Sequence, residues 1–176
     1  MVPTSLQTTR LTMRPPRPED AQGIFFGYAQ DPEVVRFMLW RAHQSLDQSR
    51  EFVQLALEGW ASNLRFPWII TRLGSDDVLG MIELRLEFGT GDVGFVLRRD
   101  HWGHGFATEA LLAVLAIAGT IPDLHRVWAI CHVDNHASAR VMEKAGMKRE
   151  ELWERYETFP NISSDPKDVY CYGMEK

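Results

Sequence analysis

The sequence predicts an α+β fold in which a mixed, mostly antiparallel twisted sheet of about six to seven strands is flanked by helices. Three observations support this expectation. Three strand-like runs joined by two tight turns follow one another between residues 67 and 99. Apolar residues recur at helical spacing before and after these runs. A strand, a helix and a second strand then follow between residues 93 and 133, an order that builds a parallel crossover.

Length and composition describe one globular unit. A chain of 176 residues fits a single domain, 1–176, and such a domain buries about 70% of the surface its unfolded chain exposes. The 45% hydrophobic content and the formal charge of -5 exclude a disordered acidic chain and a basic nucleic-acid binder. No apolar run approaches the roughly 20 residues of a membrane span, and the first residues lack a signal-peptide layout, so a cytoplasmic location is expected.

The N-terminal part predicts one strand followed by helices. Residues 10–14 alternate apolar and polar side chains and end in Pro-Pro, which suits a strand. Residues 17–37 carry helical signals that are interrupted at Asp31-Pro32, where a second short helix begins. Residues 45–63 have an amphipathic helical pattern after a capping side chain, Ser45 or Asp47.

The middle of the chain predicts an antiparallel meander. Strands are expected at 67–73, 78–88 and 93–99, and tight turns at 74–77 and 89–92 connect them.

The C-terminal part alternates helices and strands. A helix starting near Ala107 should end near Gly119, and a buried strand follows at 126–133. Residues 134–146 predict a capped helix that Gly146 ends, and the remainder predicts two strands around a loop at 157–167. Cys131 and Cys171 both sit in strand-like apolar runs, where free cysteines behave as small buried hydrophobes.

The stretch from Trp102 to Thr108 predicts an anion site, because a strand is followed at once by a glycine-rich turn and a helix. Backbone N–H groups at a helix N-terminus attract anions, and Gly103 and Gly105 allow close approach of a phosphate. Thr108 excludes the GxGxxG fingerprint, and no Gly-Lys-Ser/Thr follows to make a P-loop. A tight strand-to-helix turn that uses glycine only for its dihedral angles is the structural alternative.

Three motifs agree in order and spacing with one known family. They are Asp92 to Phe95, Trp102 to Ala110, and Asp134 through Met147. In these motifs the chain resembles the GCN5-related N-acetyltransferase (GNAT) superfamily, and specifically its branch that acetylates ribosomal-protein N-termini. The similarity extends from residues 10–21 to residues 168–174 and so covers most of the chain.

The resemblance implies acetyl-CoA as the acetyl donor. Its pyrophosphate would be held by backbone N–H groups of six residues: Gly103, His104, Gly105, Phe106, Ala107 and Thr108. Arg98 or Arg99 would add charge against the CoA phosphates, although solvated strand-end charge explains them equally well. The strand Phe95, Val96, Leu97 would bond the pantetheine arm. Asn135 matches a pantetheine-binding asparagine, and an ordinary helix N-cap is its structural reading.

The resemblance also implies direct transfer of the acetyl group to an amine. Asp92 and Glu83 are the candidate general bases, and solvent-facing strand carboxylates are the plain alternative for both. Ser138 is the candidate acid for the departing thiolate, because Met142 stands where many relatives have a tyrosine; otherwise Ser138 is a first-turn hydroxyl.

The acceptor implied is a primary amine, and a protein N-terminal α-amine is the acceptor of the resembled branch. A small amine or antibiotic acceptor, and a non-catalytic acyl-CoA-binding module, remain open. The pocket for the acceptor should involve Phe37, Trp40 and residues 159–164, whereas Trp60 is expected in the core. No metal is expected, because no CxxC or HExxH spacing is present. Relatives often form homodimers, which nothing in the sequence establishes.

Overall fold

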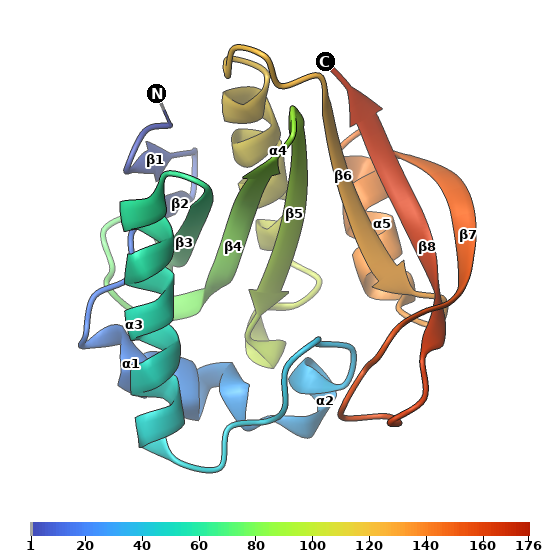
Figure 1. Cartoon of the computed structure of the whole chain (residues 1–176). Coiled ribbons are helices and arrows are strands. Elements are labelled where there is room, and N and C mark those ends of the chain that lie inside the picture. Colours follow the sequence, from blue (N-terminus) through green and yellow to red (C-terminus); the bar gives the residue numbers. More distant parts are fainter. Residues whose placement is uncertain (1) are drawn as a thin grey trace.

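The computed structural model describes residues 2–176 and contains one eight-stranded sheet with helices on both faces (Figure 1). The strand order is β1-β2-β3-β4-β5-β6-β8-β7. The strands are β1 Leu6–Gln7, β2 Leu11–Arg14, β3 Arg65–Arg72, β4 Val78–Glu87, β5 Thr90–Leu97, β6 Arg126–His132, β7 Lys148–Glu157 and β8 Lys167–Glu175. The helices are α1 Asp20–Ile24, a π-helical turn Phe25–Ala29, α2 Pro32–Val35, α3 Leu46–Ser62, a 3-10 turn Arg99–His101, α4 Phe106–Ala118 and α5 His136–Lys144.

The predicted α+β fold class is confirmed, with one more strand than expected. All neighbouring strands pair antiparallel except β5 and β6, which pair parallel. The additional strand is β1, which has two residues and pairs with Thr12 and Met13 of β2. A strand this short has no measurable alternation, so the sequence pattern did not identify it.

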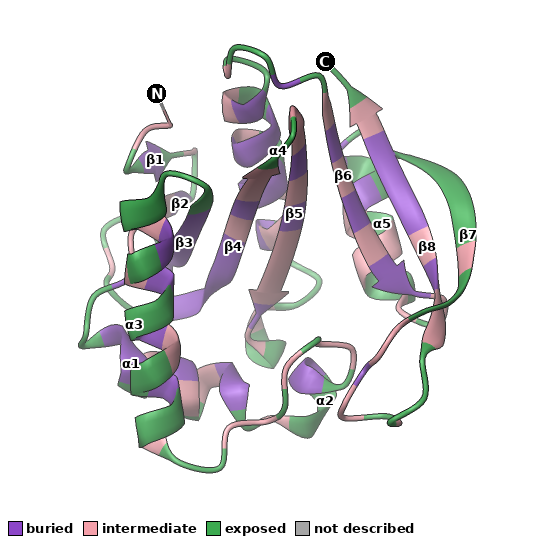
Figure 2. Ribbon diagram, viewed as in Figure 1, coloured by how far each residue is buried: buried purple, intermediate pink, exposed green. Residues whose placement is uncertain are grey.

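The two faces of the sheet bury two separate hydrophobic clusters, because neighbouring strand residues point to opposite sides. Ile70 and Ile82 belong to the cluster that includes α4, whereas Ile69 and Met81 belong to the cluster that includes α1 and α3. Figure 2 shows buried positions along β3 and β4 and an exposed β7 at the sheet edge. No helix within residues 2–176 has the length and apolarity that crossing a bilayer requires.

The helix signals of the sequence are found as predicted. The Ser45 hydroxyl accepts a hydrogen bond from the Gln48 N–H at 3.4 Å and so caps α3. Gly119 is the C-cap of α4, and Gly146, with φ of 91°, follows the end of α5. Asp31 caps α2 through a bond from the Glu33 N–H.

The β4–β5 hairpin turns earlier than the sequence predicted. The turn consists of Phe88 and Gly89, whose φ angles are 45° and 79°, and β5 already begins at Thr90. Two successive residues with positive φ make a turn whose twist matches that of the strands. This turn fixes the register that sets Arg85 opposite Asp92.

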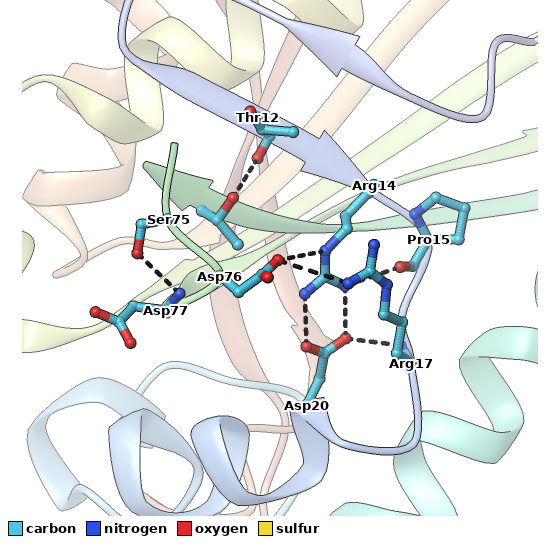
Figure 3. Close-up of polar contacts among 9 residues, drawn as sticks. Thr12, Arg14, Pro15, Arg17, Asp20, Ser75, Asp76 and Asp77 are labelled. Carbon is cyan, nitrogen blue, oxygen red and sulfur yellow. Dashed lines mark hydrogen bonds and ion pairs between the residues drawn. The ribbon is translucent and has the colours of Figure 1, made fainter. Parts of the chain in front are cut away.

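A buried ion pair ties β2 to α1 (Figure 3). The Arg14 guanidinium donates to both carboxylate oxygens of Asp20 at 2.8 Å, and the Arg17 N–H donates to the same carboxylate at 2.6 Å. Arg14 and Asp20 are only 7% and 5% exposed. The pair and its hydrogen bonds raise the pKa of Arg14, although burial opposes this.

Replacing Asp20 by alanine should destabilise the fold by about 3–5 kcal/mol, because it leaves the Arg14 guanidinium buried without its bonded partner. Only the exposed Asp76 carboxylate, 3.8 Å from the Arg14 Nε, then remains as a counter-charge. Urea unfolding followed by circular dichroism measures the loss. Asp47→Ala is the matched control, since it breaks the exposed Asp47–Arg50 pair and should cost less than about 1 kcal/mol. Equal effects of the two substitutions would contradict the prediction.

Candidate active site

The site is built where β5 and β6 separate. The two strands pair only at Thr90–Asp92 and Arg126–Trp128, and beyond these residues they diverge (Figure 1). Two cavities, of about 380 and 450 Å³, meet at this opening; the first, the donor cavity, extends along α4 and α5, and the second, the acceptor cavity, extends toward the carboxylates of β4 and β5. They share the residues Phe37, Met38, Phe95, Val96, Asn135 and Ser138.

The end of β5 directs main-chain groups into the opening. Residues of an antiparallel strand bond a given neighbour alternately, and the Arg98 N–H donates to the Leu79 carbonyl at 2.7 Å. Phe95 and Leu97 therefore direct their N–H and C=O groups away from β4 toward the opening, where the Leu97 carbonyl accepts a hydrogen bond from the Trp102 indole N–H at 2.8 Å. A Cβ on Gly80 would lie 2.1 Å from the Val96 carbonyl oxygen, so glycine is required for β5 to approach β4 this closely.

The turn before α4 presents free N–H groups to the donor cavity. Gly103 and Gly105 have φ angles of 78° and 79°, and Gly105 is the N-cap of α4. None of the N–H groups of residues 103–108 donates to an acceptor within residues 2–176. A Cβ on Gly103 would meet nothing within 4 Å. This geometry fits an anion such as a pyrophosphate.

The basic residues around the turn differ in their orientation. The Arg98 guanidinium donates to Asp100 at 2.7 Å and to the Val78 carbonyl at 3.4 Å, and it does not line the donor cavity. The His104 ring stacks on Phe106 with centroids 6.0 Å apart. His101 and Arg36 line this cavity, and α5 adds a basic face on which His136, Arg140 and Lys144 recur every fourth residue. Their spacing in the sequence could have identified this helix face.

Asn135 and Ser138 lie at the junction of the two cavities. The Asn135 side-chain oxygen accepts a hydrogen bond from the Ser138 N–H at 3.1 Å, so the N-cap interpretation is confirmed. The cap uses the amide oxygen and leaves the amide NH₂ to donate elsewhere. Met142 is buried and lines the acceptor cavity, where it offers no proton.

The two candidate carboxylates line the acceptor cavity together. Arg85 connects them: its guanidinium lies 2.5 Å from the Asp92 carboxylate and 3.6 Å from that of Glu83. Glu83 also pairs with Arg65 at 2.8 Å. Burial raises the pKa of Asp92, and the Arg85 guanidinium opposes part of the rise. Asp92 and Glu83, nine residues apart in the chain, thus share one charged network.

Aromatic side chains form the walls of the acceptor cavity. They include Phe37, Trp40, Phe52, Trp128, Tyr156 and Phe159. Trp60 is packed in the core as expected, with its indole N–H donating to the Pro67 carbonyl at 2.7 Å. Asn161, which the sequence pattern did not identify, donates to the carbonyls of Val35 and Trp40 at 2.7 and 2.8 Å. Asn161 therefore ties the loop of residues 157–167 to the segment that follows α2.

The cysteines are buried free thiols. Cys131 lines the acceptor cavity, and burial raises the pKa of its thiol to about 12. A thiol with this pKa is a poor nucleophile at neutral pH. Within residues 2–176 no three His, Cys, Asp or Glu side chains gather as a metal-ligand set.

A sheet opened between a parallel strand pair, with an anion-binding turn on one side and a carboxylate-lined cavity on the other, defines a class of enzymes that move an acyl group from CoA to an amine. The family model for the acetyltransferase (GNAT) domain matches residues 10–148. The chain belongs to this family of N-acetyltransferases.

Individual relatives are similar to this chain in sequence or structure over nearly its whole length. The uncharacterised N-acetyltransferase p20 of Bacillus licheniformis is 32% identical over 98% of this chain and 96% of its own. A GNAT-family acetyltransferase from Bacillus anthracis superposes with a TM-score of 0.85 at 25% identity, over 97% of this chain and 98% of that one. RimL, a ribosomal alpha-N-protein acetyltransferase solved with coenzyme A, superposes with a TM-score of 0.84 at 18% identity, over 99% and 97% of the two chains.

Replacing Gly105 by valine should abolish detectable acetyl-CoA binding in isothermal titration calorimetry. A β-branched residue strains a backbone with φ of 79°, so the turn must change shape and the N–H groups no longer converge. Gly74→Val is the matched control, because Gly74 has φ of 80° in the β3–β4 turn, has open space at its Cβ and does not line the donor cavity. Normal acetyl-CoA binding by the Gly105→Val protein would refute the role of the turn.

Proposed function

We propose that the protein transfers the acetyl group of acetyl-CoA directly to a primary amine in the acceptor cavity, and that a peptide N-terminal α-amine is the acceptor. The observation that carries this proposal is that the two cavities meet at the opening between β5 and β6. A donor and an acceptor bound in them would have their reacting groups side by side, which supplies much of the rate enhancement of such transfers.

The donor is held mainly by backbone groups in this proposal. The N–H groups of residues 103–108 bind the pyrophosphate, and the main chain of Phe95 and Leu97 bonds the pantetheine arm, to which the Asn135 amide NH₂ donates. Val96 lines both cavities and shapes the passage between them. Arg98 contacts a phosphate only after leaving its pair with Asp100.

A peptide α-amine suits this site because its ammonium form loses a proton, and so becomes a neutral nucleophile, at lower pH than a lysine side chain does. Its pKa lies about 2.5 units below that of lysine, so the neutral form costs about 3.4 kcal/mol less. A carboxylate that is partly engaged by an arginine, as Asp92 is, can serve as a modest base for such an amine.

Loss of a proton from the acceptor precedes the attack on the thioester. Asp92, assisted by Glu83, accepts a proton from the ammonium, and the neutral amine attacks the thioester carbon. The Leu97 N–H donates a hydrogen bond to the oxyanion that forms. When the carbon–sulfur bond breaks, Ser138 protonates the departing CoA thiolate and regains its proton from the solvent. The nitrogen that has formed the amide releases its second proton to the solvent, and Asp92 then releases the proton that it accepted from the ammonium. Cys131 takes no part as a covalent carrier.

Replacing Asp92 by asparagine should lower kcat about a hundredfold and remove the acidic limb of the kcat/KM profile. Because burial raises the pKa of Asp92, wild-type activity should fall as the pH drops through a value above that of an ordinary aspartate. Steady-state kinetics with a fixed acceptor peptide measure both quantities, and Glu87→Gln on the same hairpin is the control. If Glu83→Gln removed the limb while Asp92→Asn kept it, the base would be Glu83.

Replacing Ser138 by alanine should lower kcat about tenfold and alter the alkaline limb of its pH dependence, with the KM for acetyl-CoA unchanged. Ser138→Thr, which keeps the hydroxyl, should recover part of the activity. Full kcat and an unchanged pH profile in Ser138→Ala would eliminate the proposed acid role.

The acceptor class is tested by release of free thiol from acetyl-CoA in the presence of peptides with free or blocked N-termini, small amines and aminoglycosides, with mass spectrometry of the products. We expect acetylation of free N-termini and none of N-blocked peptides that contain lysine. Acetylation of small amines alone would overturn the peptide assignment. Tight acetyl-CoA binding without thiol release to any acceptor would indicate a binding module instead of an enzyme.

A further inference from the structure

Arg10, in the turn between β1 and β2, contacts the anion-binding turn from a distant part of the chain. Its guanidinium donates to the His104 carbonyl at 2.9 Å and to the Glu109 carboxylate at 2.6 Å, and it lies 4.7 Å above the Phe106 ring. The Arg10 main-chain N–H donates to Glu109 as well, at 2.9 Å. The Thr8 hydroxyl adds a bond to the same carboxylate at 2.6 Å.

The turn has little other support at its glycines. Apart from its chain neighbours, a Cβ on Gly103 would meet nothing within 4 Å, and a Cβ on Gly105 would meet only the Arg10 Nη2, at 3.5 Å, within residues 2–176. Glycines in an unsupported turn sample many conformations, so ordering them for a ligand costs conformational entropy. A side chain that bonds both a carbonyl inside the turn and the first turn of α4 lowers that cost before the ligand arrives.

The charge arrangement shows that Arg10 is not kept free for a phosphate. Both carboxylate oxygens of Glu109 bond Arg10, and these bonds together with that of Thr8 lower the pKa of Glu109 against the opposing effect of burial. An ionised carboxylate one turn into α4 repels an anion bound at the helix N-terminus. Glu109 therefore opposes pyrophosphate binding through its charge and can favour it only through geometry.

We propose that Arg10 is a positioning residue for acetyl-CoA: through Glu109 and the His104 carbonyl it holds residues 103–108 in the conformation that binds the pyrophosphate. This inference rests on the proposed function of the turn. It assigns to the N-terminal hairpin a role in donor binding, although Arg10 and His104 lie 94 positions apart in the chain.

The test measures acetyl-CoA affinity by calorimetry for Arg10→Gln, Arg10→Lys, Glu109→Gln and the Arg10→Gln/Glu109→Gln double variant of the full chain. Each single Gln variant should bind acetyl-CoA about tenfold more weakly than the wild-type protein. The double variant should bind no more weakly than either single variant, and Arg10→Lys should have an affinity between those of Arg10→Gln and the wild type. The KM for the acceptor should stay unchanged. Arg50→Gln, which removes a comparable exposed pair with Asp47, is the control and should bind normally.

The Glu109→Gln variant decides between positioning and direct phosphate contact. If Arg10 contacted a phosphate directly, removing its carboxylate partner would release it and delete a repulsive charge, so acetyl-CoA would bind as tightly as before or more tightly; that result overturns the proposal. A lowered Tm with unchanged acetyl-CoA affinity in Arg10→Gln also overturns the proposal, because Arg10 would then only stabilise the fold. Failure of the wild-type protein to bind acetyl-CoA would instead refute the proposed function.

Discussion

The early end of the hydrogen-bond ladder between β5 and β6 is the constraint on which the rest of the structure depends. Three residue pairs hold the strands together, and beyond them the main-chain groups of β5 that face β6 have no strand partner. The Trp102 indole N–H bonds the Leu97 carbonyl, and the remaining groups are open to a ligand or water. The same separation joins the donor and acceptor cavities, and an intact ladder would close the passage between them.

The two sides of the opening carry different charged and polar groups. On the donor side, the N–H groups of the glycine turn and the α5 face with Arg140 and Lys144 favour an anion in a chain whose formal charge is -5. On the acceptor side, Asp92 and Glu83 favour a cationic amine, while Arg85 keeps two neighbouring carboxylates from repelling each other. The opening between β5 and β6 therefore separates a side lined by free N–H groups and basic side chains from a side lined by carboxylates paired with Arg85 and Arg65.

Parts remote in sequence hold this arrangement in place. Arg10 supports the turn from the first hairpin, Asn161 connects the two loops that border the acceptor cavity, and the Arg14–Asp20 pair fixes the start of the helical segment leading to them. Arg10 and Asn161 each bond main-chain carbonyls, and Arg14 forms a two-bond pair with a buried carboxylate, so each contact fixes its geometry through more than one hydrogen bond.

The sequence by itself determined the order of elements, the glycine turn, the helix caps at Ser45 and Asn135, and the family, because these depend on local spacing and backbone dihedral preferences. It also identified Asp92 and Glu83 as neighbours on adjacent strands. The tertiary structure alone decided that the Arg98 side chain turns to Asp100, that Arg85 bridges the carboxylates and that Arg10 reaches α4. Such choices depend on which of several partners lies nearest after folding, and no local pattern encodes that distance.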